Sequence, residues 1–299
     1  MMISLSVSGQ THRFIYDYHY KVDSTDKETR KVSMVLDVNP DNVKFYNYDF
    51  VVTDSTNKTK RQNNIIWDDT PALIRKKNSN INSSYINVQN MFIVDTEDHV
   101  EWKLSDETKK FGVYKLQKAT TKFGGRNWTA WFTKDIALSE GPYKFKGLPG
   151  MIFEISDDKG NFIFSLAKSY KLPKTYDTTS IIENFAGQKP VKITEAKLKK
   201  LMLDNFNDPL HEFKEHIKNN TDPTARFMVM GIEVKSPEHL KELSENRLDL
   251  TGIETLEKSK IYYATANRNN NNTNRNLNNK NQTNKRRFNN NNNNNKNRR

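Results

Sequence analysis

Aromatic and polar side chains alternate along the first part of the chain. Residues 12–20 read HRFIYDYHY, in which Phe14, Tyr16, Tyr18 and Tyr20 recur at every second position. Side chains of a β-strand point alternately to its two faces, so this period predicts a half-buried strand. The same reasoning predicts further strands at 32–38, 43–46, 91–95, 100–104, 113–119 and 128–133. The polar stretches 54–63 and 76–84 are expected to be loops.

A hairpin and a few late helices complete the pattern. Residues 151–156 and 162–170 flank Asp-Asp-Lys-Gly at 157–160, a turn rich in residues that tolerate left-handed backbone. Thr194 is a candidate N-cap for a helix with an apolar stripe that ends near Pro209, and Ser236-Pro237 begins a shorter one. Many strands followed by little helix predict a mainly β or α+β fold, with a large curved antiparallel sheet and a few C-terminal helices.

The last 33 residues, 267–299, differ from the rest. They contain 19 Asn, 9 Lys or Arg and no acid, with Leu277 and Phe288 as the only large apolar side chains. Such a segment cannot bury enough surface to offset its ordering entropy, which predicts a disordered basic tail. A solvated spacer is one interpretation of the tail. Tethering to an anionic polymer through counterion release is the other.

Charge and cysteine content narrow the chemistry of the body, residues 11–266. The chain carries a net charge of +12, and the tail supplies nine of these charges, so the body is nearly neutral. A nearly neutral body gives no reason to expect a nucleic-acid groove. With no Cys in the chain, disulfides, thiolate nucleophiles and Cys-ligated metals are excluded. The sequence also has no apolar stretch of membrane-spanning length.

The first ten residues, MMISLSVSGQ, are mostly small or apolar, and a segment rich in charged and aromatic residues begins at Thr11. We interpret residues 1–10 as the remnant of a signal peptide. An ordinary first strand is the alternative.

No catalytic or metal-binding motif is found. His211 and His216 in HEFKEH are one residue too far apart for the zinc-protease pattern, because five helical residues advance about 500° and leave the rings roughly 140° apart. We therefore predict no metal site and no cofactor. The sequence contains no nucleophile elbow, P-loop or dinucleotide fingerprint.

The segment 118–152 is dense with unusual residues. Two glycines bracket a rigid Leu-Pro pair, which describes a tight corner leading into the predicted hairpin. The structural motif that we assign consists of Gly141, Pro142, Gly147, Leu148, Pro149 and Gly150.

Aromatic residues are the best candidates for a binding surface. Trp128 and Trp131 lie three residues apart, so in a strand they face opposite sides, and one of them is expected to be left for the surface or a groove. A single-layer sheet with few helices cannot cover both faces, and tyrosine and tryptophan offer apolar area with a polar tip. The candidate binding residues are Tyr16, Tyr18, Arg126, Trp128 and Trp131, with Arg126 positioned to meet an anionic group. The alternative is that these rings form ordinary core.

The segment resembles the GLPGLI family, whose signature reads GLPGMI at residues 147–152. The resemblance includes AWFT at 130–133, GPYKF at 141–145 and the opening strand. It extends over roughly residues 11–266. It implies a protein of Bacteroidota-type bacteria with a signal peptide and a periplasmic, outer-membrane-associated or secreted location. Genes of the family often lie beside those of TonB-dependent receptors. Where relatives often have Cys, this chain has Leu116, so that thiol is not a shared catalytic group.

Three functions remain open at this point. The first is a non-enzymatic envelope protein that binds a small hydrophobic or peptide ligand, or a partner such as an outer-membrane receptor. The second is a hydrolase whose site has no sequence signature. The third is a protein that tethers polyanions through its tail.

Overall fold

The computed structural model describes residues 10–21, 28–62, 70–88, 90–184, 189–207, 218, 228–229 and 232–239. The chain divides into two compact units, Met1–Leu256 and Glu257–Arg299, and every described residue belongs to the first. Residues 1–9 and the predicted tail at 267–299 lie outside the described residues, as do His211 and His216.

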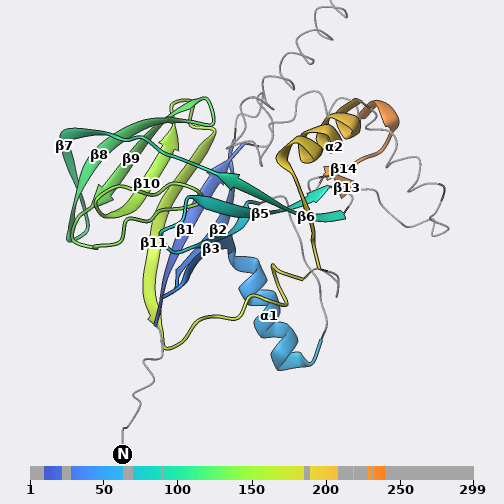
Figure 1. The fold of residues 1–299 in the computed structure, drawn as a ribbon, viewed down its shortest axis with the longest axis horizontal. Helices are drawn as coiled ribbons and strands as arrows, with labels where there is room; N and C mark the ends of the chain where they lie inside the picture. The colour runs from blue at the N-terminus through green and yellow to red at the C-terminus, as the bar shows by residue number, and fades with distance from the viewer. Residues whose placement is uncertain are drawn as a thin grey trace, which may run out of the picture. The chain divides into compact units, whose positions relative to one another are not determined.

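One large sheet dominates the described chain (Figure 1). Its strand order is β12-β6-β5-β4-β3-β2-β1-β11-β10-β9-β8-β7, and every pairing is antiparallel except that of β12 with β6. The predicted mainly β fold is confirmed. The strands are β1 (Thr11–Tyr20), β2 (Arg30–Val38), β3 (Asn42–Asn47), β4 (Ala72–Lys76), β5 (Ile81–Val88), β6 (Asn90–Glu97), β7 (Lys103–Phe111), β8 (Tyr114–Phe123), β9 (Arg126–Thr133), β10 (Met151–Asp157), β11 (Phe162–Leu172) and β12 (Val191–Ile193).

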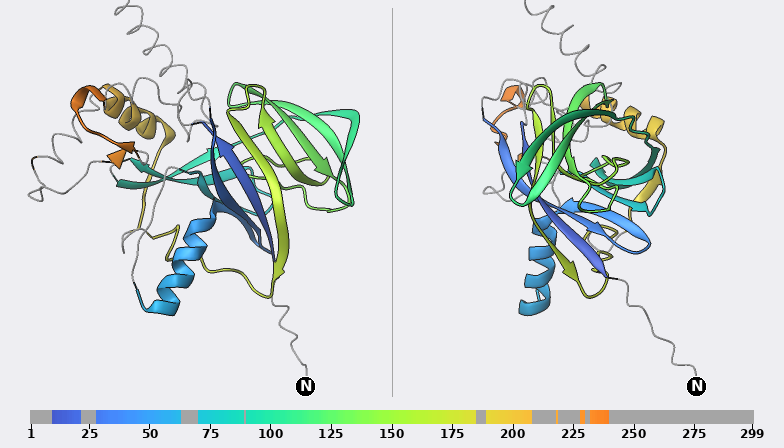
Figure 2. Two further views of the ribbon diagram at one scale, coloured as in Figure 1. Left: turned by 180° about the vertical axis from the view of Figure 1, so that it is seen from behind. Right: turned by 90° about the vertical axis from the view of Figure 1, so that its left-hand side faces the viewer.

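The sheet bends so that its two halves share one core. Side chains of β1, β2 and β3 meet those of β8, β9 and β10 in a single buried cluster. Two β-bulges help to explain the bend, one where the register of β1 on β11 shifts between Ile15 and Tyr16 and one where that of β10 on β9 shifts between Ile152 and Glu154. Figure 2 shows the half with β7–β10 turned relative to β1–β3.

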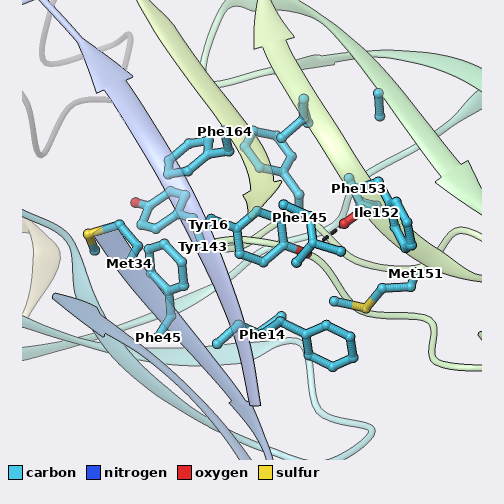
Figure 3. Packing of buried hydrophobic residues seen from close by; sticks show 14 of the residues in the cluster. Phe14, Tyr16, Met34, Phe45, Tyr143, Phe145, Met151, Ile152, Phe153 and Phe164 are labelled. Carbon is cyan, nitrogen blue, oxygen red and sulfur yellow. Dashed lines mark hydrogen bonds between the residues drawn. The ribbon is translucent and has the colours of Figure 1, made fainter. Parts of the chain in front are cut away.

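The chain between β9 and β10, residues 134–150, fills the inside of this bend. We call it the motif loop. Its Tyr143, Phe145 and Leu148 are fully buried and belong to the shared core. In Figure 3 the Tyr143 and Phe145 rings lie among the side chains of the strands, and the Tyr143 ring meets the edge of Phe45 with centroids 6.2 Å apart.

Helix α1 (Tyr48–Lys60) corrects one prediction, since residues 54–63 were expected to be a loop. The Asn47 side chain caps the helix by accepting a hydrogen bond from the Asp49 backbone N–H at 2.9 Å. Phe50 is buried against the second face of β1–β3, where Ile15 and Val35 lie. Because Phe50 is the only apolar side chain that the helix buries, no apolar stripe revealed it in the sequence.

Two more predicted boundaries change in the structure. β5 begins inside the stretch 76–84 that was expected to be a loop. Of the strand expected at 100–104, only 103–104 lie in a strand, which is β7, and its mostly polar, exposed residues show no period that would predict its full extent. Helix α2 (Glu195–Asn207) follows the predicted cap, with the Thr194 hydroxyl accepting from the Lys197 N–H at 3.2 Å. A separate pair, β13 (Met228–Val229) and β14 (Ile232–Glu233), forms a two-stranded sheet. None of the helices in the described part of the chain is long and apolar enough to cross a membrane.

Candidate functional site

The glycines of the motif loop occupy positions that side chains would disrupt. Gly147 has φ +94° and Gly150 has φ +152°, both in the region that disfavours L-residues. A Cβ at Gly150 would lie 2.0 Å from the Thr133 carbonyl oxygen, whereas one at Gly147 would only come within 4.0 Å of the Trp102 ring nitrogen. Gly150 is therefore required by space as well as by backbone conformation.

The start of the loop is equally crowded. A Cβ at Gly141 would lie 2.7 Å from Ile152 Cδ1 and 2.8 Å from the Phe145 carbonyl oxygen. Tyr143 has φ +58°, although it is not glycine, and it is fully buried. The Tyr16 hydroxyl donates to the Ile152 carbonyl oxygen at 2.5 Å, which joins the hairpin to β1. These contacts give the predicted structural motif a clear structural role.

A buried group of charges ties the motif loop to the sheet. The Glu140 carboxylate pairs with the guanidinium of Arg75 on β4, whose side chain is fully buried. Arg75 Nη1 also donates to Asn82 Oδ1 at 3.0 Å, and Asn82 Nδ2 donates to Asp98 Oδ2 at 2.9 Å. Lys144 approaches the same Asp98 oxygen at 2.9 Å with a fully buried side chain. Four charged groups from the loop and from β4–β6 thus form one connected network.

Lys146 lies at the outer end of this network. Its ammonium donates to the Ser79 carbonyl oxygen, and its own carbonyl accepts from Trp102 Nε1 at 2.8 Å. Burial lowers the pKa of Lys146, and the charge of Arg75 lowers it further. Burial raises the pKa of the Glu140 carboxyl, a change that Arg75 and Lys146 oppose. A carboxyl and an amine that both shift toward neutrality are the kind of groups that transfer protons.

Three of the predicted binding residues lie in the core instead. Tyr16, Tyr18 and Trp128 are at most 1% exposed. Trp128 Nε1 donates to the Phe123 carbonyl oxygen at 2.9 Å, and the Tyr18 ring stacks on Phe164 with centroids 4.2 Å apart. These rings do not line an open groove, because the bend of the sheet and the motif loop cover the face on which they lie.

Arg126 is also engaged within the protein. Its Nη1 donates to the Asp157 carboxylate at 3.2 Å, and its guanidinium lies over the Phe162 ring, 4.6 Å from the centroid. Only 11% of its side chain is exposed. The predicted role in meeting an anionic group would require this pair to open.

Trp131 is the exception among the candidates, and it is half-buried on the opposite face of β9 from Trp128. Glu154 of β10 is its cross-strand partner. Lys109 of β7 lies 4.4 Å from the centroid of the Trp131 ring and pairs with the Glu154 carboxylate. This face of β7–β10, which we call the outer face, therefore has a tryptophan beside a lysine–glutamate pair.

More aromatic side chains lie on the same face. Phe111 is two residues beyond Lys109 on β7 and pairs with Tyr114 of β8. Both rings meet the ring of Phe153 edge-on, with centroids 5.4 and 5.0 Å apart. We define the outer-face cluster as five residues. Leu116 and Phe153 are buried members of the shared core, and three half-buried rings pack against it: Phe111, Tyr114 and Trp131.

The tip of the β7–β8 hairpin extends from this cluster. Gly112 and Val113 form the turn, and the Val113 side chain is 93% exposed. An apolar side chain with this exposure is the most accessible part of the region. Of the predicted binding residues, the structure thus brings only Trp131 to an accessible surface, and its neighbours come from strands that the prediction did not connect.

Sequence reasoning missed Arg75, Glu140 and the outer-face cluster. Arg75 lies in a strand that was not predicted, and Glu140 directly precedes the GPYKF text without a motif of its own. Phe111 and Tyr114 flank a Gly-Val pair, which is a hairpin signal in retrospect. The described residues contain no group of three or more His, Asp or Glu that could hold a metal ion.

Comparisons with known proteins add little beyond the motif. A search of curated proteins finds no match. Two solved structures of PNGF-II, in C2 and P21 space groups, are similar at 16% and 17% identity, with TM-scores of 0.46 and 0.47. Each match covers 65% of this chain and 33% of the solved chain, so the matched part of this protein corresponds to about a third of PNGF-II. Residues 124–154, which include the GLPGMI signature, match a family described as "Protein of unknown function (Porph_ging)".

Proposed function

We propose that this chain is a non-enzymatic binding protein of the bacterial cell envelope, and that it contacts a partner protein through the outer-face cluster. The observation that carries the proposal is the partly exposed Trp131 on the same face as Phe111 and Tyr114, which are also partly exposed. In the described chain, α1 packs against β2 and β3 and α2 against β6, far along the sheet order from these strands. Neither helix therefore covers the exposed part of these half-buried rings, which an external contact could bury.

The composition of the cluster favours a protein as the partner. Tyrosine, tryptophan and phenylalanine are enriched at the centres of protein interfaces, where burial of their rings contributes most of the affinity. Lys109 lies over the Trp131 ring, and its charge is already neutralised by Glu154. A partner with apolar side chains would bury the rings without leaving an unpaired charge. Val113 at the hairpin tip extends the contact area.

The envelope location rests on the family resemblance. The signature at 147–152 falls inside the segment that matches a family of unknown function, and the GLPGLI name and the expected signal peptide belong to this same proposal. An outer-membrane receptor of the TonB-dependent class is the partner that the resemblance suggests. Export would be tested by fractionating the native host and sequencing the N-terminus of the mature protein. A cytoplasmic protein that begins at Met1 would contradict it.

Site-specific crosslinking tests the partner surface directly. A photoreactive amino acid placed at Val113 should crosslink one envelope protein in intact cells, which mass spectrometry identifies. The same amino acid at Lys159 is the matched control, because Lys159 is exposed in the turn of the β10–β11 hairpin. With the identified partner purified, Trp131→Ala should weaken binding about tenfold or more. Equal crosslinking at both tips, or unchanged affinity of Trp131→Ala, would refute the proposal.

A hydrolase is the second candidate, and the perturbed Glu140–Lys146 pair favours it. Glu140 would act as the proton donor and Lys146 as a nearby base, with Arg75 holding the carboxyl in place. If the protein is a hydrolase, it should cleave at least one substrate in a panel of esters, amides and glycosides. Glu140→Gln should abolish this activity while the fold is retained. Activity unaffected by this change would place any catalysis elsewhere.

A further inference from the structure

The C-terminal half of β11 has one unpaired edge. β1 pairs with β11 along its whole length, from Thr11 opposite Leu172 to Tyr20 opposite Phe162. β10 pairs with β11 only where Glu154, Ile155 and Ser156 oppose residues 163–165. Among the strands described, none pairs with the other edge of residues 167–172, and Figure 1 shows β11 running on beyond β10. The backbone N–H and C=O groups along that edge are therefore available to an added strand.

Both faces of this half-strand are exposed to solvent, although the Lys168 ammonium lies over the Tyr48 ring of α1, 5.7 Å from its centroid. Residues 167–171 are all exposed, although side chains alternate between the two faces of a strand. The bulge between Ile15 and Tyr16 lies at the point where β10 ceases to pair, and a bulge bends its strand away from a neighbour. An additional strand would thus find room beside β11 without displacing β10.

The charges on the edge indicate which strand fits. Lys168 and Lys171 lie on opposite faces, since they are three residues apart, and residues 167–174 contain no acid. Arg13, which faces Tyr170, is already paired with Asp37, with Nη2 2.6 Å from the carboxylate. Burial, followed by the charge of Lys171, lowers the pKa of His12 opposite. The two exposed lysines are therefore the charges that an added strand meets.

Lysines on a free edge also repel a copy of the same edge, a common protection against aggregation. They do not repel an acidic strand. We infer that the free edge of β11 at residues 167–172 binds an extended acidic segment of a partner protein by strand addition, with one carboxylate on each face. This surface is separate from the outer-face cluster, so its test does not depend on the proposed function.

The spacing of the two lysines gives a specific test. The probe is a short, end-capped peptide of threonine and valine with two glutamates three positions apart, so that one carboxylate reaches each lysine. Its positional isomer has the glutamates two positions apart and places both on one face. The basic tail of the full-length protein binds both isomers equally, because their charge is the same. The first isomer should bind several-fold more tightly than the second, because the second isomer can form only one of the two ion pairs.

Protein and peptide variants separate strand addition from simple charge attraction. Lys168→Glu with Lys171→Glu should weaken the first isomer about tenfold or more, whereas the control Lys115→Glu with Lys122→Glu, on exposed positions of β8, should not. Methylating alternate backbone nitrogens on the side of the peptide that faces β11 should abolish binding. Bound peptide should slow exchange of the amides in 167–172 that point away from β1. Equal binding of the isomers or of the methylated peptide would overturn the inference. Slow exchange in the free protein of those amides in 167–172 that point away from β1, with no peptide binding, would show that the edge is already covered and would overturn it too.

Discussion

The two faces of β9 differ in what covers them. Trp128 on the inner face is 1% exposed, and the motif loop and the bend of the sheet enclose it. Trp131, three residues later on the outer face, is half-buried, with Lys109 over its ring. The inner face is fully occupied by the protein's own residues, whereas the outer face leaves aromatic area for something else to cover. In this fold the signature motif fills the core. The β7–β8 hairpin, which has no sequence motif, carries partly exposed aromatic residues on the outer face.

The two faces of β9 show that an aromatic residue in a strand can have two different roles. On the inner face the rings contribute to stability, because their burial removes apolar area from water. On the outer face a ring that remains accessible contributes less to stability and more to recognition. Substitutions on the two faces should therefore change different measured quantities.

The largest effect should come from the glycine that limits the inner face. Gly150→Ala should lower the free energy of unfolding by about 4 kcal/mol, since the Cβ overlaps the Thr133 carbonyl and the backbone conformation is strained. Gly147→Ala should cost only about 1 kcal/mol, because its backbone is strained but the space is open. Urea denaturation of both variants measures the difference. Equal costs would mean that the loop shifts to relieve the overlap.

The two tryptophans provide the next test. Trp128→Phe should cost about 2 kcal/mol, because it leaves a cavity and removes the hydrogen bond to the Phe123 carbonyl. Trp131→Phe should cost less than about 1 kcal/mol, since its ring is partly in water. Thermal denaturation of the purified variants is sufficient. If Trp131→Phe were the more destabilising change, the outer face would belong to the core.

The buried charges under the motif loop predict a pH effect. The Glu140 pKa is raised in the folded protein, so between its ordinary and its raised value the folded state binds more protons than the unfolded state. Stability from this group is lost as the pH rises through that window and returns as the pH falls. Relative to Glu140→Gln, which does not titrate, the wild-type protein should therefore gain stability as the pH falls through that window. A difference that stays constant with pH would contradict the raised pKa.

The smallest effect is expected for the tail, which belongs to neither face. Deletion of residues 267–299 should leave the melting temperature unchanged within about 2 °C, because the segment has almost no apolar side chains to bury. Calorimetry of the full and shortened chains measures this. A clear drop would mean that the tail packs on the folded unit. Any binding of the tail to an anionic polymer should weaken steeply with salt.

The sequence predicted the regular elements whose side chains follow a simple period. β1, β2, β9 and the β10–β11 hairpin were expected near their observed positions, and Thr194 was expected to cap α2. The sequence did not predict α1, because a helix that buries one apolar side chain has no detectable apolar stripe. It also did not predict most of β7, which is an edge strand of mostly exposed polar residues.

The candidate surface was predictable only in part. The spacing of Trp128 and Trp131 correctly predicted that they lie on opposite faces, because that follows from strand geometry alone. Which face would be covered depended on the motif loop folding inward and on the two bulges, neither of which has a local signal. Tyr16 and Tyr18 were therefore assigned to an open groove when they are core. Long-range coverage of this kind is a tertiary property and not a property of any single segment.

The pairing of β1 has a consequence for the order of synthesis. β1 finds β2 soon after it emerges, but its other neighbour, β11, follows about 150 residues later, which is the kind of non-local pairing that folds slowly. Until then the nascent chain presents an aromatic strand with an empty edge, a species prone to aggregate. Chains that terminate before β11 should be insoluble, and a chaperone that holds the nascent protein should recognise β1. The strand that completes the pairing of β1 is also the one that keeps part of its own edge free.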